Sequence, residues 1–371
     1  MTETVTLFLC GDVMTARGID QALPYPGDPE LHEHYVKDAR HYRTMIESAS
    51  GPVLTPLDYR ALWGAALDEL ARVQPAARII NLETSITRSD AHWRGKAVHY
   101  RMNPANIGCL DAAAIDCCAL ANNHVLDWGY PGLDDTLTTL GEAGMSHCGA
   151  GADLRAARSP AVLPRDGYRI IVVAAASTSS GVPKQWAAGP QSPGVHLLSD
   201  QPEVDAARIA EDVQAVRQPG DVVVASLHWG PNWSYDIPPQ HIDLAHHLID
   251  RAGVDVVHGH SSHHVKAFEV YHGKLVLYGC GDFINDYEGI SGHEAFRGDL
   301  SLMYFPTLAR GTGHLIRLEM VPTTMHRAQV RRASDADAGW LAARLNREGQ
   351  RFGMSVSRQP DGRLLLDCDS Q

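Results

Sequence analysis

Short apolar runs recur along the chain, and most of them stop at a polar residue or a glycine. They lie at 5–10, 78–82, 114–120, 168–176, 221–227 and 254–257. Runs of this length, rich in β-branched residues, predict buried strands. Several are separated by segments with apolar residues at helical spacing, at 61–73, 131–143, 202–217 and 238–252. Strands that alternate with helices predict an α/β protein.

Three other regions complete the prediction. Residues 20–58, rich in Pro, Gly, His and Tyr, predict a long excursion with a helix near 31–48. Two hairpin strands, 265–271 and 274–279, flank the turn His272-Gly273. The tail predicts a helix over 335–350 and two short strands around Asp361-Gly362. We therefore expect a main domain over residues 1–322 and a small C-terminal α/β extension over 323–371.

Five of the predicted strands are followed by side chains that can bind a metal or transfer a proton. These are Asp12, Glu83, Asn123 with His124, His228, and His260 with His263. In α/β proteins, ligands gather beyond the carboxyl ends of the strands, so these side chains are expected to converge. Burying so many polar groups is costly unless something satisfies them, which favours a site over packing.

The charges of this set favour a metal. Asp12 and Glu83 would repel each other when packed together, unless one takes up a proton or a cation lies between them. Mixed carboxylate, amide and imidazole donors suit Mn, Zn or Fe. We expect one or two divalent transition-metal ions. Two ions would activate a water molecule and stabilise the leaving oxygen of a displacement.

The motifs, taken in order, resemble the CapA family of poly-gamma-glutamate capsule synthesis proteins, which belongs to the calcineurin-like metallophosphatase superfamily. The resemblance covers residues 5–320. It rests on Gly11-Asp12-Val13-Met14 with Arg17, Asn81-Leu82-Glu83, Asn122-Asn123-His124 with Asp127 and Gly129, His228-Trp229-Gly230, Gly259-His260-Ser261-Ser262-His263, and Tyr278-Gly279-Cys280-Gly281-Asp282-Phe283.

The resemblance implies a four-layer αββα metallophosphatase-like sandwich with the site at one edge of two central sheets. It implies Asp12 as a ligand of the first metal, Glu83 as the bridge, and Asn123 and His228 as ligands of the second. His260 and His263 would complete both coordination spheres. His124 would be the proton donor or anion stabiliser, oriented by Asp127. Arg17, one turn after Asp12, is a candidate clamp for a substrate anion.

The chain departs from the family pattern at three positions. Met14 stands where the superfamily usually has a histidine, so the first metal has fewer ligands. Ser261 stands where another histidine is common, so either His260 substitutes for it or the second metal is altered. Asp282 stands where many relatives have asparagine, and it adds a carboxylate near the site and a candidate further ligand. His264 is the alternative to His263, because a shift of one residue would exchange the two.

The charge and the apolar content of the chain exclude some classes of binding partner. The chain has 371 residues, with 32 basic and 44 acidic side chains, and its net charge of −12 argues against nucleic acid and anionic membranes as partners. No stretch of 18 uncharged apolar residues is present, so no membrane-spanning segment is expected. The first residues lack the features of a signal peptide, which predicts a cytoplasmic protein.

The leading hypothesis is an enzyme, a CapA-like metal-dependent hydrolase. A metal-activated water would attack a phosphoester or a gamma-glutamyl, amide-like bond of an anionic small molecule or polymer, in poly-gamma-glutamate or capsule metabolism. A non-catalytic accessory protein with a vestigial metal site is one alternative, and a phosphatase of a small metabolite is another. The polar segment 285–299 follows the last motif and is a candidate lid or specificity loop.

Overall fold

The computed structural model describes residues 3–367, and its core is built from two large β-sheets. The strands of the larger sheet follow the order β19-β20-β17-β16-β1-β2-β5-β6, and β15 and β18 pair with β1 and β17 beside this path. Their bounds are β1 Thr4–Val13, β2 Ala77–Leu82, β5 Cys117–Ala119, β6 Ser146–Cys148, β15 Asp282–Ile284, β16 Leu300–Ala309, β17 Leu315–Met325, β18 Val330–Arg332, β19 Val356–Arg358 and β20 Leu364–Leu366.

The smaller sheet has the order β13-β14-β12-β11-β9-β8. Its strands are β8 Ala161–Arg165, β9 Tyr168–Ala176, β11 Val222–His228, β12 Val256–His260, β13 Phe268–Tyr271 and β14 Lys274–Leu277. The predicted hairpin is β13 and β14, which pair antiparallel. Two minor pairs lie outside both sheets, β3 (Ser85–Ile86) with β4 (Arg101–Met102) and β7 (Ala150–Gly151) with β10 (Gly194–Val195).

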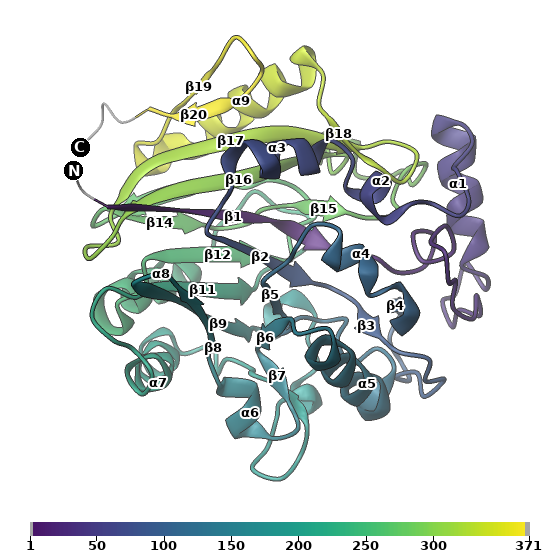
Figure 1. Cartoon of the computed structure of the whole chain (residues 1–371), viewed down its shortest axis with the longest axis horizontal. Coiled ribbons are helices and arrows are strands. Elements are labelled where there is room, and N and C mark those ends of the chain that lie inside the picture. The colour runs from purple at the N-terminus through teal and green to yellow at the C-terminus, as the bar shows by residue number, and fades with distance from the viewer. Residues whose placement is uncertain (1–2, 368–371) are drawn as a thin grey trace.

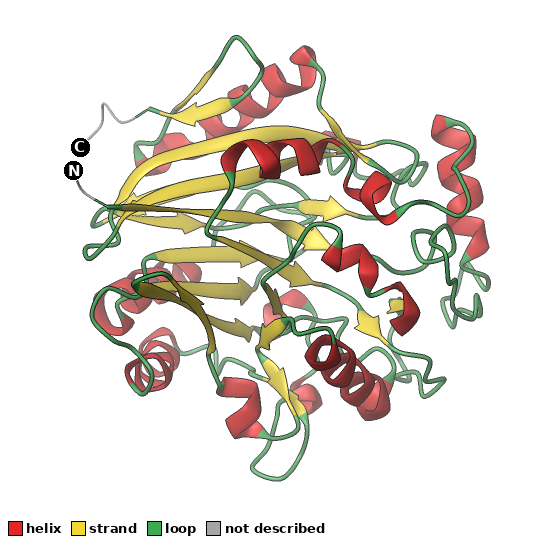
Figure 2. Ribbon diagram, viewed as in Figure 1, coloured by secondary structure: helices red, strands yellow, loops and turns green. Residues whose placement is uncertain are grey.

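The two sheets pack face to face and are covered by helices on their outer sides (Figures 1 and 2). The strands can pack on both faces because the side chains of neighbouring residues in a strand point to opposite faces of the sheet. Val222 and Val224 of β11 join the core between the sheets, whereas Val223 packs with residues of α7 (Pro202–Gln214) and α8 (Pro239–Ala252). On the other side, α2 (Tyr59–Trp63), α3 (Ala65–Val73) and α9 (Asp335–Gly349) cover the larger sheet. The predicted four-layer αββα sandwich is confirmed.

Most predicted helices lie where the spacing of apolar residues placed them, with two differences. The helix expected over 61–73 is split into α2 and α3 at Gly64, whose φ of 44° is left-handed. A Cβ at Gly64 would lie 2.3 Å from the carbonyl oxygen of Val330, so the close approach requires glycine. The helix expected near 31–48 begins only at Arg40, as α1 (Arg40–Ser50), because residues 30–38 fold back into a bridge between Glu30 and Asp38.

The remaining helices are short or lie beside the sheets. They are α4 (Gly108–Asp111), α5 (Gly129–Glu142) and α6 (Leu154–Arg158), and α5 packs against β3 and β6. None of the described helices is both long and apolar enough to cross a membrane.

The C-terminal tail continues the larger sheet. Strand β17 runs across residue 322, and β18 and β20 both pair with it. Helix α9 begins as predicted, with the Ser334 hydroxyl accepting a hydrogen bond from the Asp337 amide. The division of the chain into domains at residue 322 stays a prediction.

Parallel pairing brings the functional strand ends to one edge of the sandwich. Asp12 of β1 lies opposite Asn81 of β2 and Asp282 of β15, and His228 of β11 lies opposite His260 of β12. The arrowheads of these strands point to the same side of the molecule (Figure 1). The carboxyl ends of both sheets therefore face a common site.

Candidate metal centre

The centre is a buried set of carboxylates and imidazoles at this edge. Asp12 and Asp282 come from neighbouring strands, Glu83 directly follows β2, and His228 and His260 end strands of the smaller sheet. These five residues are at most 2% exposed. The loop after β12 adds His263, which is 7% exposed.

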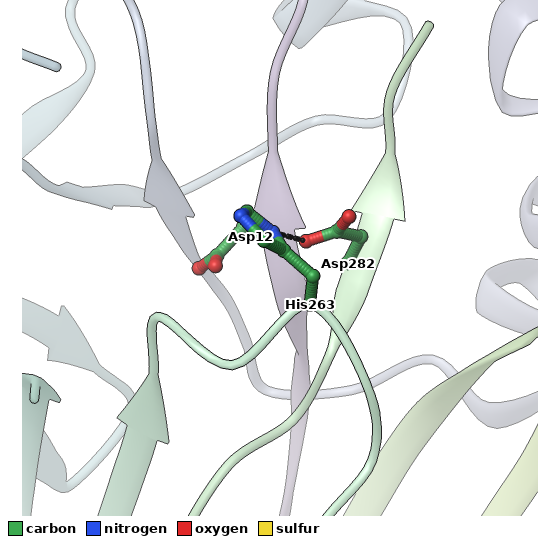
Figure 3. A group of neighbouring side chains, drawn as sticks. All are labelled: Asp12, His263 and Asp282. Carbon is green, nitrogen blue, oxygen red and sulfur yellow. Dashed lines mark hydrogen bonds and ion pairs between the residues drawn. The ribbon is translucent and has the colours of Figure 1, made fainter. Parts of the chain in front are cut away.

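Within this set, two groups of three have ligand atoms within 4.8 Å of one another. One consists of Asp12, Glu83 and His228, and the other of Asp12, His263 and Asp282. Figure 3 shows the second group, with Asp12 and Asp282 side by side on adjacent strands and the His263 ring reaching toward them from a loop. Asp12 belongs to both groups.

Amide side chains hold the first group in place. Asn81 donates from Nδ2 to Asp12 Oδ1 over 2.8 Å. Asn123 Oδ1 accepts from His228 Nε2 over 3.0 Å, and the same nitrogen lies 3.7 Å from Glu83 Oε1. The structure thus brings Asn123 and His228 together beside Glu83. Their roles as ligands stay predictions.

Two buried atoms of the centre have no hydrogen-bond partner within residues 3–367. One is Glu83 Oε2 and the other is His260 Nδ1, which lies 3.8 Å from Asp12 Oδ1. The other ring nitrogen of His260 contacts Ser226 Oγ at 2.6 Å. An unsatisfied buried acceptor costs about 1–3 kcal/mol, so atoms left open toward carboxylates fit a bound cation.

The electrostatics of the carboxylates support the same interpretation. Burial and the charge of Asp282 raise the pKa of Asp12 to about 6, against the opposing effect of hydrogen bonds from Glu83 and Asn81. Burial and the neighbouring Asp12 also hold the pKa of Glu83 well above its ordinary value. Without a cation, the pair therefore retains a proton at neutral pH. A divalent ion would remove that need.

A second polar array flanks the centre on the Glu83 side. His124 Nδ1 lies 2.5 Å from Asp127 Oδ2, and His124 Nε2 lies 3.8 Å from Glu83 Oε1. Lys96 Nζ donates to Asp127 Oδ1 and to the carbonyl oxygen of Asn123. Burial lowers the pKa of His124, and the charge of Lys96 lowers it further. The imidazole is therefore neutral, with one nitrogen fixed by Asp127 and the other directed toward the centre.

The turn after β5 places Asn123 beside His228 of the centre and His124 beside Asp127 of the second polar array. Asn122 Oδ1 accepts hydrogen bonds from the amides of His124 and Val125, each over 3.0 Å. This is the local capping typical of asparagine. Because Asn122 closes the turn, the side chain of Asn123 is left to face His228.

Arg17 is buried and paired with the protein's own carboxylates. Its Nη2 lies 2.5 Å from Asp286 Oδ1 and its Nη1 lies 3.1 Å from Glu33 Oε1. The guanidinium also stacks 3.7 Å from the centroid of the Tyr42 ring. In this structure Arg17 ties the N-terminal strand's exit to the 285–299 segment. Its role as a clamp for a substrate anion stays a prediction.

The positions that depart from the family pattern have clear environments. Met14 is buried, and its sulfur lies 3.7 Å from the hydroxyl of Tyr287. Ser261 has a left-handed φ of 90°, and its amide donates to Asp12 Oδ2 over 3.3 Å. His264 turns away and accepts from the Ser234 amide, whereas His263 Nδ1 lies 2.8 Å from Asp282 Oδ1. Of the two histidines, the structure brings His263 to the centre.

Lys96 was not singled out from the sequence, and Asn81 was named only as part of the motif Asn81-Leu82-Glu83, with no role of its own. Asn81 sits inside the run 78–82 and carried a signal, since it is the polar residue in an apolar strand. Lys96 lies in a polar loop with no periodicity, and its partners are 27 to 31 residues further along the chain. Only the fold reveals it.

A cavity of about 350 Å³ adjoins the His263 side of the centre. The segment 285–299 supplies most of its lining, and Trp233 forms part of the wall. Asn285 lines the cavity and donates to Asp282 Oδ2 over 3.1 Å. The predicted lid or specificity loop therefore lines a cavity that Asn285 connects to Asp282.

Comparisons with known proteins agree with the motif resemblance. Residues 6–287 match the family described as bacterial capsule synthesis protein PGA_cap. The chain is 46% identical over 364 residues to a protein of Mycobacterium tuberculosis named probable polyglutamine synthesis accessory protein, with 98% of this chain and 96% of that protein covered. It is 29% identical over 249 residues to the PGA biosynthesis protein CapA of Bacillus subtilis, with 67% of this chain and 61% of that protein covered. It is 28% identical over 291 residues to the capsule biosynthesis protein CapA of Bacillus anthracis, with 76% of this chain and 60% of that protein covered.

Proposed function

The chain belongs to the bacterial capsule synthesis protein PGA_cap family, and from this premise we propose that it is a metal-dependent hydrolase serving the synthesis of a capsule or polyglutamate-type polymer. The substrate would be an anionic small molecule or polymer, cleaved at a phosphoester or a gamma-glutamyl, amide-like bond. One observation carries the proposal. The buried group of Asp12, Glu83 and His228, with Glu83 Oε2 unpartnered among the described residues, lies directly beside the His124–Asp127 pair.

The donor set suits a divalent transition metal. Asp12, Glu83, Asn123 and His228 would hold one ion, and His260 and His263 offer further imidazole nitrogens. Carboxylate, amide and imidazole donors together fit Mn, Zn or Fe. When bound, such an ion supplies a Lewis acid and a nucleophilic water at neutral pH.

The protein's own residues would manage the proton of the leaving group. Asp127 accepts from His124 Nδ1, so it fixes the ring and stabilises the imidazolium when Nε2 is protonated. Nε2 faces Glu83 and carries no proton in the neutral ring, so it would first take up a proton from the attacking water and then pass it to the departing oxygen or nitrogen. Lys96 holds the second oxygen of Asp127, which keeps the carboxylate turned toward the ring.

The substrate would approach through the cavity beside His263. The protein carries a net charge of −12, which by itself repels an anion. Bound divalent ions reverse the local sign at the centre, so an anionic group is attracted there and not elsewhere. The proposal keeps the cytoplasmic location predicted from the sequence.

A non-catalytic accessory role is the second candidate, and two observations favour it. Met14 offers only a thioether where the superfamily usually has an imidazole, and thioethers are poor ligands for hard or borderline ions. In addition, the Mycobacterium tuberculosis relative carries the word accessory in its name. A polymer-binding protein could keep the metal without turning over a substrate.

The test is hydrolysis by protein purified without chelators. Metal content would be measured by mass spectrometry, and hydrolysis of bis(p-nitrophenyl) phosphate, p-nitrophenyl phosphate and gamma-glutamyl-p-nitroanilide would be followed with Mn²⁺, Zn²⁺ or Fe²⁺. We expect turnover by the wild type and a loss of at least about 100-fold in Glu83→Gln. Glu142→Gln, at an exposed carboxylate of α5, is the control and should match the wild type.

The outcomes separate the candidates. Hydrolysis that depends on both the metal and Glu83 supports the hydrolase. Bound metal without hydrolysis of any substrate supports the accessory role. Protein that binds no transition metal would reject the proposal.

A further inference from the structure

We propose that Asp282 is a metal ligand, and that Asp12, His263 and Asp282 form a second cation position that shares Asp12 with the group of Asp12, Glu83 and His228 (Figure 3). This inference deepens the proposed function and rests on its metal centre. It adds a ligand outside the expected set and moves the shared carboxylate from Glu83 to Asp12.

Strand pairing places the two carboxylates of this position. Strands β1 and β15 run parallel, with Asp12 and Asp282 as register partners. The pairing puts both side chains at the same height on adjacent strands, and both are at most 1% exposed. Two carboxylates in this arrangement repel unless a cation or a proton lies between them.

No lysine or arginine of residues 3–367 neutralises these carboxylates by an ion pair. The partners of Asp282 are His263 Nδ1 at 2.8 Å from Oδ1 and Asn285 Nδ2 at 3.1 Å from Oδ2. Asp12 accepts hydrogen bonds from Asn81, the Ser261 amide and protonated Glu83, and His260 Nδ1 lies 3.8 Å from its Oδ1. Elsewhere in the chain, buried carboxylates do pair with a base, as Asp127 does with Lys96. A protonated His263 would balance Asp282, which leaves the negative charge of Asp12 without a cationic partner among the described residues.

An unpartnered nitrogen gives independent support. His260 Nδ1 is buried, has no hydrogen-bond partner within the described chain, and is directed at Asp12 Oδ1. An imidazole nitrogen aimed at a carboxylate it does not reach is the arrangement expected around a missing ion. Because Asp12 is the residue that both His260 and the Asp282 group face, it is the carboxylate placed to be shared.

Asp282 also accounts for the absence of a good ligand at Met14. The Met14 sulfur lies 3.7 Å from the Tyr287 hydroxyl. Asp282 reaches the same end of β1 from the neighbouring strand, with two oxygens suited to Mn²⁺. Asp282 would thus supply the metal ligand that Met14, at the end of β1, does not.

The experiment counts Mn²⁺ ions in the full chain. Metal-free protein would be dialysed against Mn²⁺, and bound metal measured by mass spectrometry and by electron paramagnetic resonance. We expect two ions in the wild type, with the broadened signal of two Mn²⁺ ions sharing a ligand. Asp282→Asn should bind one ion with an isolated six-line signal, and its affinity for the second should fall by about 100-fold or more, beyond the effect of losing an outer partner. Asp134→Asn, at an exposed carboxylate of α5, is the matched control.

A second variant guards against misfolding. His263→Asn should lose the same ion, and the double variant should bind no less metal than either single variant. Circular dichroism would confirm that each is folded. Two ions in folded Asp282→Asn would overturn the inference, as would one ion in both the wild type and this variant. In the latter case a single-ion hydrolase would still stand, whereas a wild type that binds no Mn²⁺, Zn²⁺ or Fe²⁺ would overturn the proposed function as well.

Discussion

Asp12→Asn should stabilise the metal-free protein at pH 8 and destabilise it, relative to the wild type, once metal is present. In the metal-free fold, Asp12 is buried beside two other carboxylates, and burial raises its pKa to about 6 from an ordinary value of 3.8. Above pH 6 the fold therefore contains an ionised group that the unfolded chain solvates better. Asparagine has nearly the same shape and no charge, so the substitution removes this penalty.

The magnitude follows from the pKa difference. The gap between 3.8 and about 6 corresponds to about 3 kcal/mol of unfolding free energy. Asparagine can keep the bond from Asn81 to Oδ1, but it loses the acceptor for the Ser261 amide, at a cost of about 1 kcal/mol. The variant should thus be about 2 kcal/mol more stable than the wild type at pH 8. Its advantage should fall by about 2.4 kcal/mol as the pH drops from 8 to 4, where the wild-type carboxyl is protonated in the fold and about two-fifths protonated in the unfolded chain.

Urea unfolding followed by circular dichroism, at pH 8, 6 and 4, measures this difference on metal-free protein. Mn²⁺ at 100 times its Kd should then add about 2.7 kcal/mol to the wild type and much less to the variant, which reverses their order at pH 8. Asp299→Asn should show neither effect, because solvent screens its charge. A stability difference that does not change between pH 8 and pH 4, or a wild type that is more stable without metal at pH 8, would refute the reasoning.

Three further predictions concern the flanking array and one distant histidine. His124→Gln should keep its metal and lose about 10²–10⁴-fold in turnover, which metal analysis and rates on the same sample would show; loss of metal would mean that His124 is a ligand. Lys96→Met should cost about 3 kcal/mol in urea unfolding, because it leaves the buried Asp127 unpaired, and Lys96→Arg should recover part of it. Burial lowers the pKa of His196 to about 4 from 6.5, so the wild type should lose up to about 3 kcal/mol as the pH falls from 6.5 toward 4, and His196→Asn should lose that much less over the same range.

The sequence allowed the fold class and the converging strand ends to be predicted because both depend on local patterns. Asp12, His228 and His260 each follow an apolar run, and a strand's end is also its exit from the core. Once the strands are parallel, their ends meet at one edge without any further information. The motif resemblance, confirmed by the family match, added the layering of the sandwich.

Other parts of the centre depend on contacts between distant residues, which local patterns do not encode. Arg17 reads as a free cation near a strand end, yet its partner Asp286 is 269 residues away in the chain. Lys96 meets Asp127 only because the loop that carries it folds over the turn after β5. Gly64 likewise interrupts a helix where the backbone of Val330 packs against it, and the spacing of apolar residues does not reveal this contact.

The two sheets contribute different donor groups to the proposed cation site. The larger sheet supplies the carboxylates Asp12, Glu83 and Asp282, and the smaller sheet and the loop after it supply the imidazoles His228, His260 and His263. Burial keeps the pKa of His228 and His260 low, so these rings stay neutral and cannot balance the acids opposite them. His263 is the exception, because the charge of Asp282, 2.8 Å away, raises its pKa against the effect of burial. Coordination of a divalent ion by both sheets, as proposed above, would neutralise the remaining carboxylates and use the lone pairs of the rings. On this reasoning the ion is a structural link between the two sheets as well as the source of the chemistry.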